Sequence, residues 1–193
     1  MTHEAGPVVE GDGLWLRPPV YADYPAWADI RERSRAHLTP FEPQWSAEEL
    51  ARASFRRRVR HYQREIRDDL GYAFFIFLTG SDTGGGDALA GGITLSNLRR
   101  GVTQAVTLGY WIGKPYAGQG IMSKAVSAVL PFVFEGLRLH RIEAACLQHN
   151  LPSIRVLESN GFRYEGLARK YLRIEGKWQD HRLYALLEGD RCP

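Results

Sequence analysis

The sequence predicts an α/β fold, an α+β mixed sheet of about seven strands flanked by about four helices. The 193 residues suffice for one domain with a substantial core. With 44% hydrophobic and 24% charged residues, the composition is that of a folded chain rather than a disordered one. Strand-like and helix-like apolar patterns alternate along the chain, which favours a sheet covered by helices. We therefore expect one domain over residues 1–193, with its core at about 14–187.

The N-terminal part of the chain predicts one strand and two helices. Leu14–Arg17 is a short apolar strand that prolines follow. Asp23 is placed to cap the first helix. Ser46 and Glu49 have the spacing of a capping box, so the second helix is expected from Ser46 to about residue 67. The apolar sides consist of Tyr24, Trp27 and Ile30 in the first helix and of Ala51, Phe55, Val59, Tyr62 and Ile66 in the second.

The other faces of the second helix are rich in arginine. The arginines are Arg52, Arg56, Arg57, Arg58, Arg60, Arg64 and Arg67. A solvated charged surface is the simpler interpretation, and a docking surface for an acidic or RNA-bearing partner such as a ribosome stays open. The net charge of the whole chain is only +3, which is too small to indicate a nucleic-acid partner by itself.

The rest of the chain predicts six more strands and two more helices. The strands are expected at Gly71–Leu78, Ala88–Leu98, Gln104–Ile112, Ile142–Leu147, Gly166–Ile174 and Trp178–Leu187. One helix is expected at Ser123–Glu135, and the other follows Asn150 and ends at Gly161 in the C′ position. The polar, glycine-rich segment Ser81–Asp87 is interpreted as a flexible hairpin connection.

Several classes of protein are disfavoured by what the sequence lacks. No apolar run is long enough to span a bilayer, and the N-terminus has no signal-peptide pattern. Cys146 and Cys192 cannot form a disulfide framework, and neither belongs to a Cys-x-x-Cys pair. The histidines show no metal-ligand spacing. We therefore expect a cytoplasmic protein that binds neither a membrane nor a metal.

A glycine-containing loop joins the strand that ends at Ile112 to the next helix. Gly118 and Gly120 allow close approach of a ligand to the backbone, and the unpaired N–H groups of a helix start favour phosphate or pyrophosphate. Gln119-Gly120 stands where a P-loop needs Lys-Ser/Thr, and Ser123 stands where a dinucleotide motif needs a third glycine. Nucleoside triphosphates and dinucleotides are thus disfavoured, while a tight turn without a ligand stays open.

The segment Tyr116–Ser123 resembles the cofactor loop of the GNAT acetyltransferase superfamily, in the form found in its RimJ/RimL type. Two positions depart from the wider pattern, Ala117 from a polar residue and Met122 from a small one. The segment Asn150–Phe162 resembles a second motif of the same superfamily, in the expected order. The resemblance implies a GNAT-like fold with splayed central strands and acetyl-CoA as cosubstrate. The cofactor-binding positions that it implies are Tyr110, Trp111, Ile112, Gly118, Gln119, Gly120, Ile121, Met122, Ser123 and Asn150.

The resemblance further implies direct attack of an amine on the thioester, with a proton supplied to the departing thiolate. Ser153 is our candidate for the proton donor, with capping of its helix as an equal alternative. Asn150 is assigned to the pantetheine arm, to capping of the same helix, or to both. Cys146 is expected to be a small buried residue, with a position near the CoA thiol as the alternative.

The general base is left open by the sequence. The strand Gln104–Ile112 carries no carboxylate. His181, next to Asp180, is a residue type that titrates near neutral pH but is equally plausible as a surface residue. An ordered water is as good a candidate, because the amine of a free peptide N-terminus has a pKa near 8, so much of it is already neutral.

The acceptor is also left open. Phe41, Trp45, Tyr171 and Trp178 could line a peptide-sized cleft, although core packing is the commoner role of each type. The leading hypothesis is an N-acetyltransferase for the N-terminal amine of a ribosomal or other cytosolic protein. The alternatives are acetylation of a small amine, such as an antibiotic or polyamine, and a CoA-binding regulatory module without catalysis.

Overall fold

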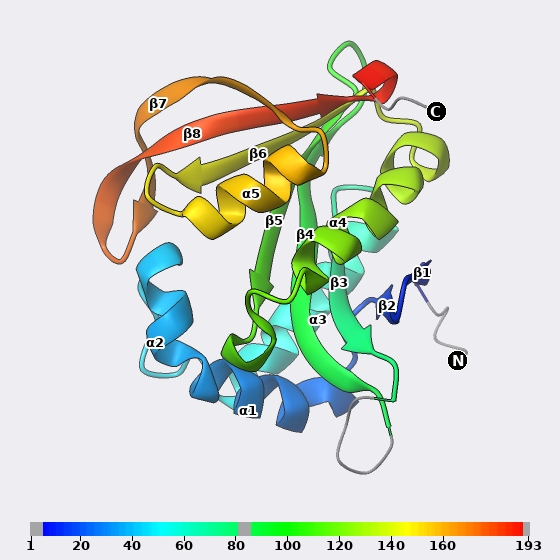
Figure 1. The fold of residues 1–193 in the computed structure, drawn as a ribbon. Coiled ribbons are helices and arrows are strands. Elements are labelled where there is room, and N and C mark those ends of the chain that lie inside the picture. Colours follow the sequence, from blue (N-terminus) through cyan, green and yellow to red (C-terminus); the bar gives the residue numbers. More distant parts are fainter. Residues whose placement is uncertain (1–5, 81–85, 191–193) are drawn as a thin grey trace.

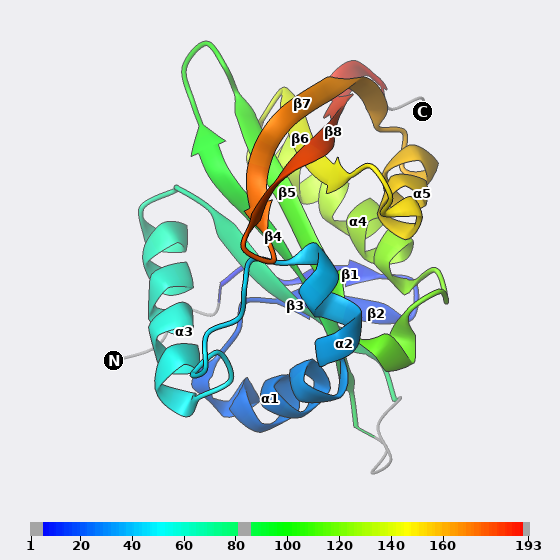
Figure 2. The same cartoon turned by 90° about the vertical axis from the view of Figure 1, so that its left-hand side faces the viewer.

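The computed structural model describes residues 6–80 and 86–190, which build an eight-stranded sheet with helices on both faces (Figures 1 and 2). The strands are β1 Val9–Gly11, β2 Leu14–Arg17, β3 Tyr72–Leu78, β4 Ala88–Arg99, β5 Ala105–Ile112, β6 Arg141–Leu147, β7 Arg163–Ile174 and β8 Lys177–Leu187. The α-helices are α1 Tyr24–Arg33, α2 Arg35–Leu38, α3 Arg52–Arg67, α4 Ile121–Pro131 and α5 Leu151–Ser159. The predicted mixed sheet is confirmed, with β1 as the one strand that its three-residue length hid from the sequence pattern.

The sheet has a single parallel contact, and it is incomplete. Along the order β1-β2-β3-β4-β5-β6-β8-β7, every neighbouring pair is antiparallel except β5 and β6. These two strands pair from Ala105 and Arg141 only as far as Leu108 and Ala144. Beyond that point they diverge, as the expectation of splayed central strands required (Figure 1). The gap leaves backbone N–H and C=O groups without a partner strand.

Each face of the sheet has its own apolar cluster, because side chains alternate along a strand. The face that α4 and α5 cover is called the α5 face, and the opposite one, covered by α1 and α3, the α3 face (Figure 2). Fully buried members on the α5 face include Ile76, Ile93, Val106, Val126, Val129 and Ile142. The α3 face buries Trp27, Ile30, Phe55, Val59, Phe75, Phe77 and Leu89. The predicted stripes of both N-terminal helices therefore reach the core.

The predicted capping box at Ser46 and Glu49 is wrong, because α3 begins only at Arg52. The intervening residues form a turn, and the extended backbone of Ala51 (ψ 143°) separates it from the helix. The carboxylate of Glu49 accepts a hydrogen bond from Arg58 at 2.6 Å instead of capping a helix. The same residue spacing therefore forms a turn here, because the Glu49 carboxylate, which a capping box would use, binds Arg58 instead.

The ends of α4 and α5 follow the sequence more closely. α4 starts at Ile121, two residues earlier than expected, and its last turn widens into a π-helix over Phe132–Gly136. α5 ends as predicted, with Gly161 at φ +83° in the C′ position. Most of the expected hairpin connection, residues 81–85 of Ser81–Asp87, lies outside the described residues.

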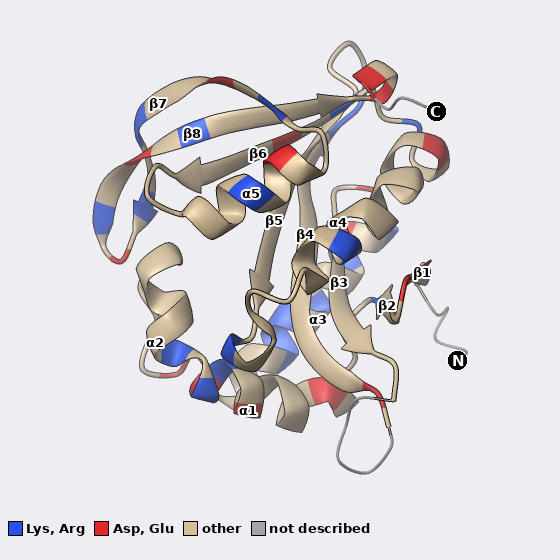
Figure 3. Cartoon of the chain, in the orientation of Figure 1, with Lys and Arg blue, Asp and Glu red and all other residues tan. Residues whose placement is uncertain are grey.

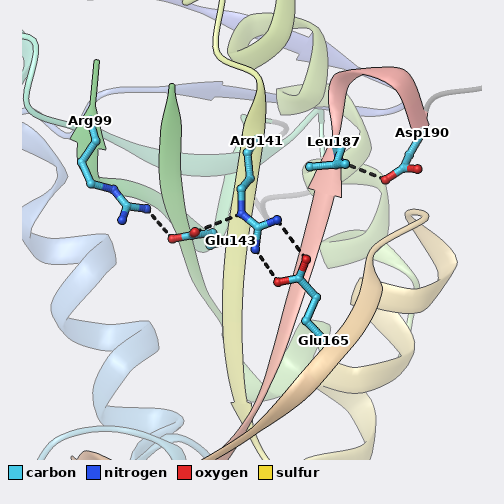
Figure 4. A network of polar contacts seen from close by, with 6 residues as sticks. All are labelled: Arg99, Arg141, Glu143, Glu165, Leu187 and Asp190. Carbon is cyan, nitrogen blue, oxygen red and sulfur yellow. Dashed lines mark hydrogen bonds and ion pairs between the residues drawn. The ribbon is translucent and has the colours of Figure 1, made fainter. Parts of the chain in front are cut away.

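A network of ion pairs crosses the sheet at the end where β5 and β6 are still paired (Figure 4). Glu143 of β6 accepts hydrogen bonds from Arg99 of β4 and from Arg141 at 3.0 Å. Arg141 also makes a bidentate contact with Glu165 of β7, and this contact lowers the pKa of the Glu165 carboxyl. Since β5 and β8 lie between these strands, the network ties five strands together at the closed end of the sheet.

Six of the seven arginines of α3 are exposed to solvent and Arg58 is half-buried, in agreement with the simpler interpretation. Figure 3 marks the arginine positions of α3 in blue along the ribbon. Seven arginines against one glutamate give α3 a formal charge of +6, so the rest of the chain carries −3 of the total of +3. Within residues 6–80 and 86–190, Arg56, Arg60 and Arg64 have no ion-pair partner. No helix in the described part is both long and apolar enough to cross a bilayer.

Candidate functional site

A cavity of about 790 Å³ opens where β5 and β6 diverge. Residues from both faces of the sheet line it. Tyr110 and Ser153 belong to the α5 face, whereas Trp111 belongs to the α3 face. The gap between the two strands therefore connects one side of the sheet with the other.

The loop before α4 forms one wall of the cavity. Gly118 and Gly120 both have φ +76°, a left-handed conformation that favours glycine. The N–H groups of Ile121, Met122 and Ser123 have no intrahelical acceptor, and the first backbone bond of the helix runs from Lys124 to Gly120. An anion at this wall would meet these donors and the positive end of the helix dipole.

The predicted cofactor residues differ in what they offer to the cavity. Gly118, Gly120, Ile121, Met122 and Ser123 all line it. Gln119 does not, because its side-chain amide donates to the carbonyl of Pro115 at 2.8 Å. Two cations that the sequence analysis did not single out, Lys114 and Arg155, also line the cavity. They add positive charge to the lining of the cavity, which favours an anionic ligand.

Ser153 and Tyr110 form a hydroxyl pair between α5 and β5. Ser153 Oγ lies 2.9 Å from Tyr110 Oη, which also donates to the backbone carbonyl of Ser153 at 3.2 Å. Burial raises the pKa of the Tyr110 phenol, so this side chain stays protonated at neutral pH. The pair thus presents two protonated hydroxyls to the cavity, in the position where the sequence placed a proton donor.

Asn150 caps α5, and this decides one of the alternatives for Ser153. The side-chain oxygen of Asn150 accepts from the N–H of Ser153 at 3.3 Å, so the capping group is Asn150 and not the Ser153 hydroxyl. Contact of Asn150 with pantetheine stays a prediction. Cys146 is buried, as expected, and burial raises the pKa of its thiol, which contacts Ser153.

The cavity lining contains a carboxylate that the sequence analysis did not single out, that of Glu42. Arg31 donates to both of its oxygens at 2.8 and 2.7 Å, and Trp45 Nε1 donates to one of them at 2.7 Å. The Arg31 guanidinium lies 4.5 Å from the ring centre of Trp45 and 5.1 Å from that of Trp111. This arrangement fixes Glu42 in the cavity wall.

The four aromatic residues expected around the acceptor divide into three groups. Phe41 lines the cavity, together with Leu172 and Ile174 of β7. Trp45 does not line it and packs over Arg31. Tyr171 and Trp178 are 48% and 62% exposed and do not line the cavity. They therefore belong neither to the expected cleft nor to the core.

His181 lies in the cavity wall and is only 3% exposed, so its interpretation as a surface residue is wrong. Its Nδ1 atom lies 2.9 Å from the carbonyl oxygen of Gln179. The neighbouring carboxylate of Asp180 points away to a different partner, the N–H of Lys170 at 2.8 Å. The two residues that the sequence placed together therefore have separate environments, and only His181 belongs to the cavity.

The comparison with known proteins agrees with this geometry. The family model described as the acetyltransferase (GNAT) domain matches residues 13–163. The chain is 36% identical over 183 residues to "Probable N-acetyltransferase YjcK" of Bacillus subtilis, covering 95% of this chain and 98% of that protein. It is 33% identical over 173 residues to the [ribosomal protein uS5]-alanine N-acetyltransferase of Escherichia coli, covering 89% and 87%.

Among solved structures, the chain is similar to Mycobacterium smegmatis RimJ in complex with CoA-disulfide. The TM-score is 0.89 at 31% identity, with 97% of this chain and 90% of that chain covered. Both the sequence match over most of the chain and the shared fold lead to one conclusion. The chain belongs to the GNAT family of N-acetyltransferases.

Proposed function

We propose that residues 1–193 form one acetyltransferase domain that transfers an acetyl group from acetyl-CoA to the N-terminal amine of a ribosomal or other cytosolic protein. The observation that carries the proposal is the cavity between β5 and β6, which opens on both faces of the sheet. A thioester entering from the α5 face would meet an amine arriving from the α3 face. Direct transfer requires this meeting of two substrates in one gap.

The residues present fit acetyl-CoA, which supplies the activated acetyl group as a thioester. The N–H groups at the start of α4, with Lys114 and Arg155, suit its pyrophosphate. Backbone N–H groups at the splayed end of β5 are available to polarise the thioester carbonyl. The hydroxyl of Ser153, held by Tyr110, is placed to donate the proton that the departing thiolate needs.

A protein N-terminus suits the acceptor end better than a polycationic drug does. Among the described residues that line the cavity, Glu42 is the only carboxylate, and Arg31 is already paired with it. A polyamine or aminoglycoside would need several such groups. The relatives that act on ribosomal protein uS5 support the same choice, and the exposed arginines of α3 offer positive charge to ribosomal RNA. Such an acceptor places the enzyme in the cytoplasm.

The proposal is tested by incubating the protein with acetyl-CoA and peptides that copy the N-termini of ribosomal proteins. Thiol release and a mass gain of one acetyl group are measured, with spermidine and an aminoglycoside in parallel. The matched control is the same peptide with a blocked N-terminus, which should release no thiol. Acetylation of the small amines alone would contradict the proposed acceptor. Binding of acetyl-CoA without thiol release from any amine would indicate a regulatory module.

A further inference from the structure

The ring of His181 is held in one tautomer, with one nitrogen left for the cavity. The carbonyl oxygen of Gln179 can only accept, so the ring nitrogen 2.9 Å away, Nδ1, carries the hydrogen. In the neutral ring the lone pair then lies on Nε2. No residue in the described part of the chain hydrogen-bonds to Nε2.

Nε2 keeps access to the cavity even though the residue is almost fully buried. Among the described residues, the only fully buried side-chain nitrogen or oxygen without a partner is Arg31 Nε. Nε2 of His181 also lacks a hydrogen-bond partner. If it were fully buried it would be a second atom of this kind, so Nε2 retains some solvent-exposed surface. His181 is one of the residues that line the cavity, so the cavity is the space to which we assign this surface. A fixed, unshared lone pair inside a catalytic cavity is what a general base requires.

His181 lies on the side of the sheet from which the amine would arrive. Tyr184 of β8 donates to Glu158 of α5 at 3.1 Å, so Tyr184 belongs to the α5 face. Three residues earlier on the same strand, His181 belongs to the α3 face. Ser153 lies on α5 itself. The two residues therefore stand on opposite sides of the gap, one beside the incoming nitrogen and the other beside the departing sulfur.

Three other side chains of the cavity are potential proton acceptors, and each is less suitable. Arg31 and Trp45 already donate three hydrogen bonds to the oxygens of Glu42. Burial, and to a smaller extent the positive charge of Lys114, lower the pKa of His37. The protonated form of His37 is therefore disfavoured, which makes it a weaker proton acceptor. Cys146 lies at the α5 face, and burial raises the pKa of its thiol.

The charged and titratable neighbours of His181 leave its Nε2 atom without a hydrogen-bond partner in the described part of the chain. On β7, the ring of Tyr171 lies edge-on with its centre 6.0 Å away. The Asp180 carboxylate accepts from the backbone N–H of Lys170, and Leu147 is the partner of His181 on β6. Arg182, the next residue along β8, points to the opposite face, so it does not oppose a positive charge on the imidazole. The Gln179 carbonyl would stabilise the imidazolium once it forms.

We propose that His181 is the general base that removes the proton from the acceptor amine, an assignment that rests on the proposed acetyl transfer. The Nε2 lone pair takes the amine proton as the nitrogen bonds to the thioester carbon. The carbon–sulfur bond then breaks, and the thiolate receives a proton from Ser153. The imidazolium releases its proton to solvent, and Ser153 regains one from solvent. The products are an amide and a thiol.

The test compares two substitutions in the chain of residues 1–193. His181→Asn keeps an amide near the position of Nδ1, and with it the bond to Gln179, but removes the base. We expect kcat to fall by about 10²-fold or more, with the Kd for CoA unchanged. Because only the unprotonated ring can accept the amine proton, the wild-type pH profile of kcat should show an acidic limb that the variant lacks. The matched control, His37→Gln, should keep that limb.

Each result has a definite meaning. The assignment would be overturned if His181→Asn had nearly wild-type activity, or if it lost activity but kept the pH limb. Loss of the limb in His37→Gln would also overturn it. The assays use whichever amine the wild-type protein acetylates best. If that amine is a small molecule, the proposed protein acceptor is contradicted, but the assignment of His181 as the base can still be tested. Absence of thiol release with every amine overturns both. Should His181→Asn not fold, acylation of wild-type histidines by diethylpyrocarbonate decides: inactivation must track modification of His181, and not of His37.

Discussion

At the residue scale, the structure gives Ser153 a role that its replacement should reveal. Its hydroxyl contacts Tyr110 and leaves capping of α5 to Asn150. In Ser153→Ala we expect kcat to fall by about 10²-fold, because the thiolate loses its proton donor. Stability should change little, since the cap remains. Steady-state kinetics, thermal denaturation and CoA binding measure the three quantities.

The control for that substitution is Tyr110→Phe, which keeps the ring in the core and removes only the hydroxyl. Because burial keeps the phenol protonated, Tyr110 positions Ser153 rather than titrating near neutral pH. Its loss should lower kcat less than the loss of Ser153. The role assigned to Ser153 would be refuted by a Ser153→Ala enzyme with the wild-type kcat, or by equal losses in CoA affinity and turnover.

The residues of the site were accessible to sequence reasoning to different degrees. Ser153 and Asn150 lie within a short motif, so their neighbourhood could be predicted from local spacing. Glu42 could not, because its partner Arg31 is eleven residues away and the loop between them has no regular period. The direction of the His181 ring depends on which face of β8 it occupies and on one carbonyl, neither of which has a side-chain signature.

At the element scale, alanine substitutions in the loop before α4 should affect cofactor binding more than they affect folding stability. An added Cβ at Gly118 or Gly120 would meet no protein atom within 4 Å, so alanine there costs only the left-handed backbone strain of about 1 kcal/mol. The same atom would protrude where the backbone must approach pyrophosphate. We therefore expect Gly118→Ala and Gly120→Ala to raise the KM for acetyl-CoA.

The matched control is Gly101→Ala in the turn between β4 and β5. Gly101 has φ +65° and likewise meets nothing within 4 Å, but it does not line the cavity. Its free energy of unfolding should drop by a similar amount while the KM for acetyl-CoA stays unchanged. A KM that rises equally in all three variants would show that strain, and not contact with the cofactor, is responsible.

Elements with a strong period could be predicted from the sequence, and those defined by distant partners could not. The strands β3, β4, β6 and β8 carry long apolar patterns, and Gly161 ends α5 as its conformational freedom suggests. The start of α3 differs from the prediction because the Glu49 carboxylate accepts from Arg58 and the Leu50 carbonyl accepts from the Tyr24 hydroxyl at 3.1 Å. These contacts arise only once the helices pack together, so local capping rules cannot anticipate them.

At the scale of the whole molecule, the decisive feature is a sheet that is tied at one end and open at the other. The ion pairs around Arg141 hold the strands at the end where β5 and β6 are paired (Figure 4). At the opposite end the two strands separate and the cavity opens. The number and order of strands follow from apolar patterns, but a missing pairing leaves no trace in composition or periodicity. Only the family resemblance predicted the splay.

An open gap through the sheet predicts that both substrates are bound at once, without an acyl-enzyme. Within residues 6–80 and 86–190, Cys146 is the only thiol that lines the cavity, and burial raises its pKa, which disfavours the nucleophilic thiolate. Initial rates at several concentrations of both substrates should therefore give intersecting double-reciprocal lines, and Cys146→Ala should leave kcat little changed. Parallel lines, together with loss of turnover in Cys146→Ala, would instead demonstrate transfer through the thiol. In that case the sheet would serve one substrate at a time, and the opening of its two faces into one cavity would lose its mechanistic reason.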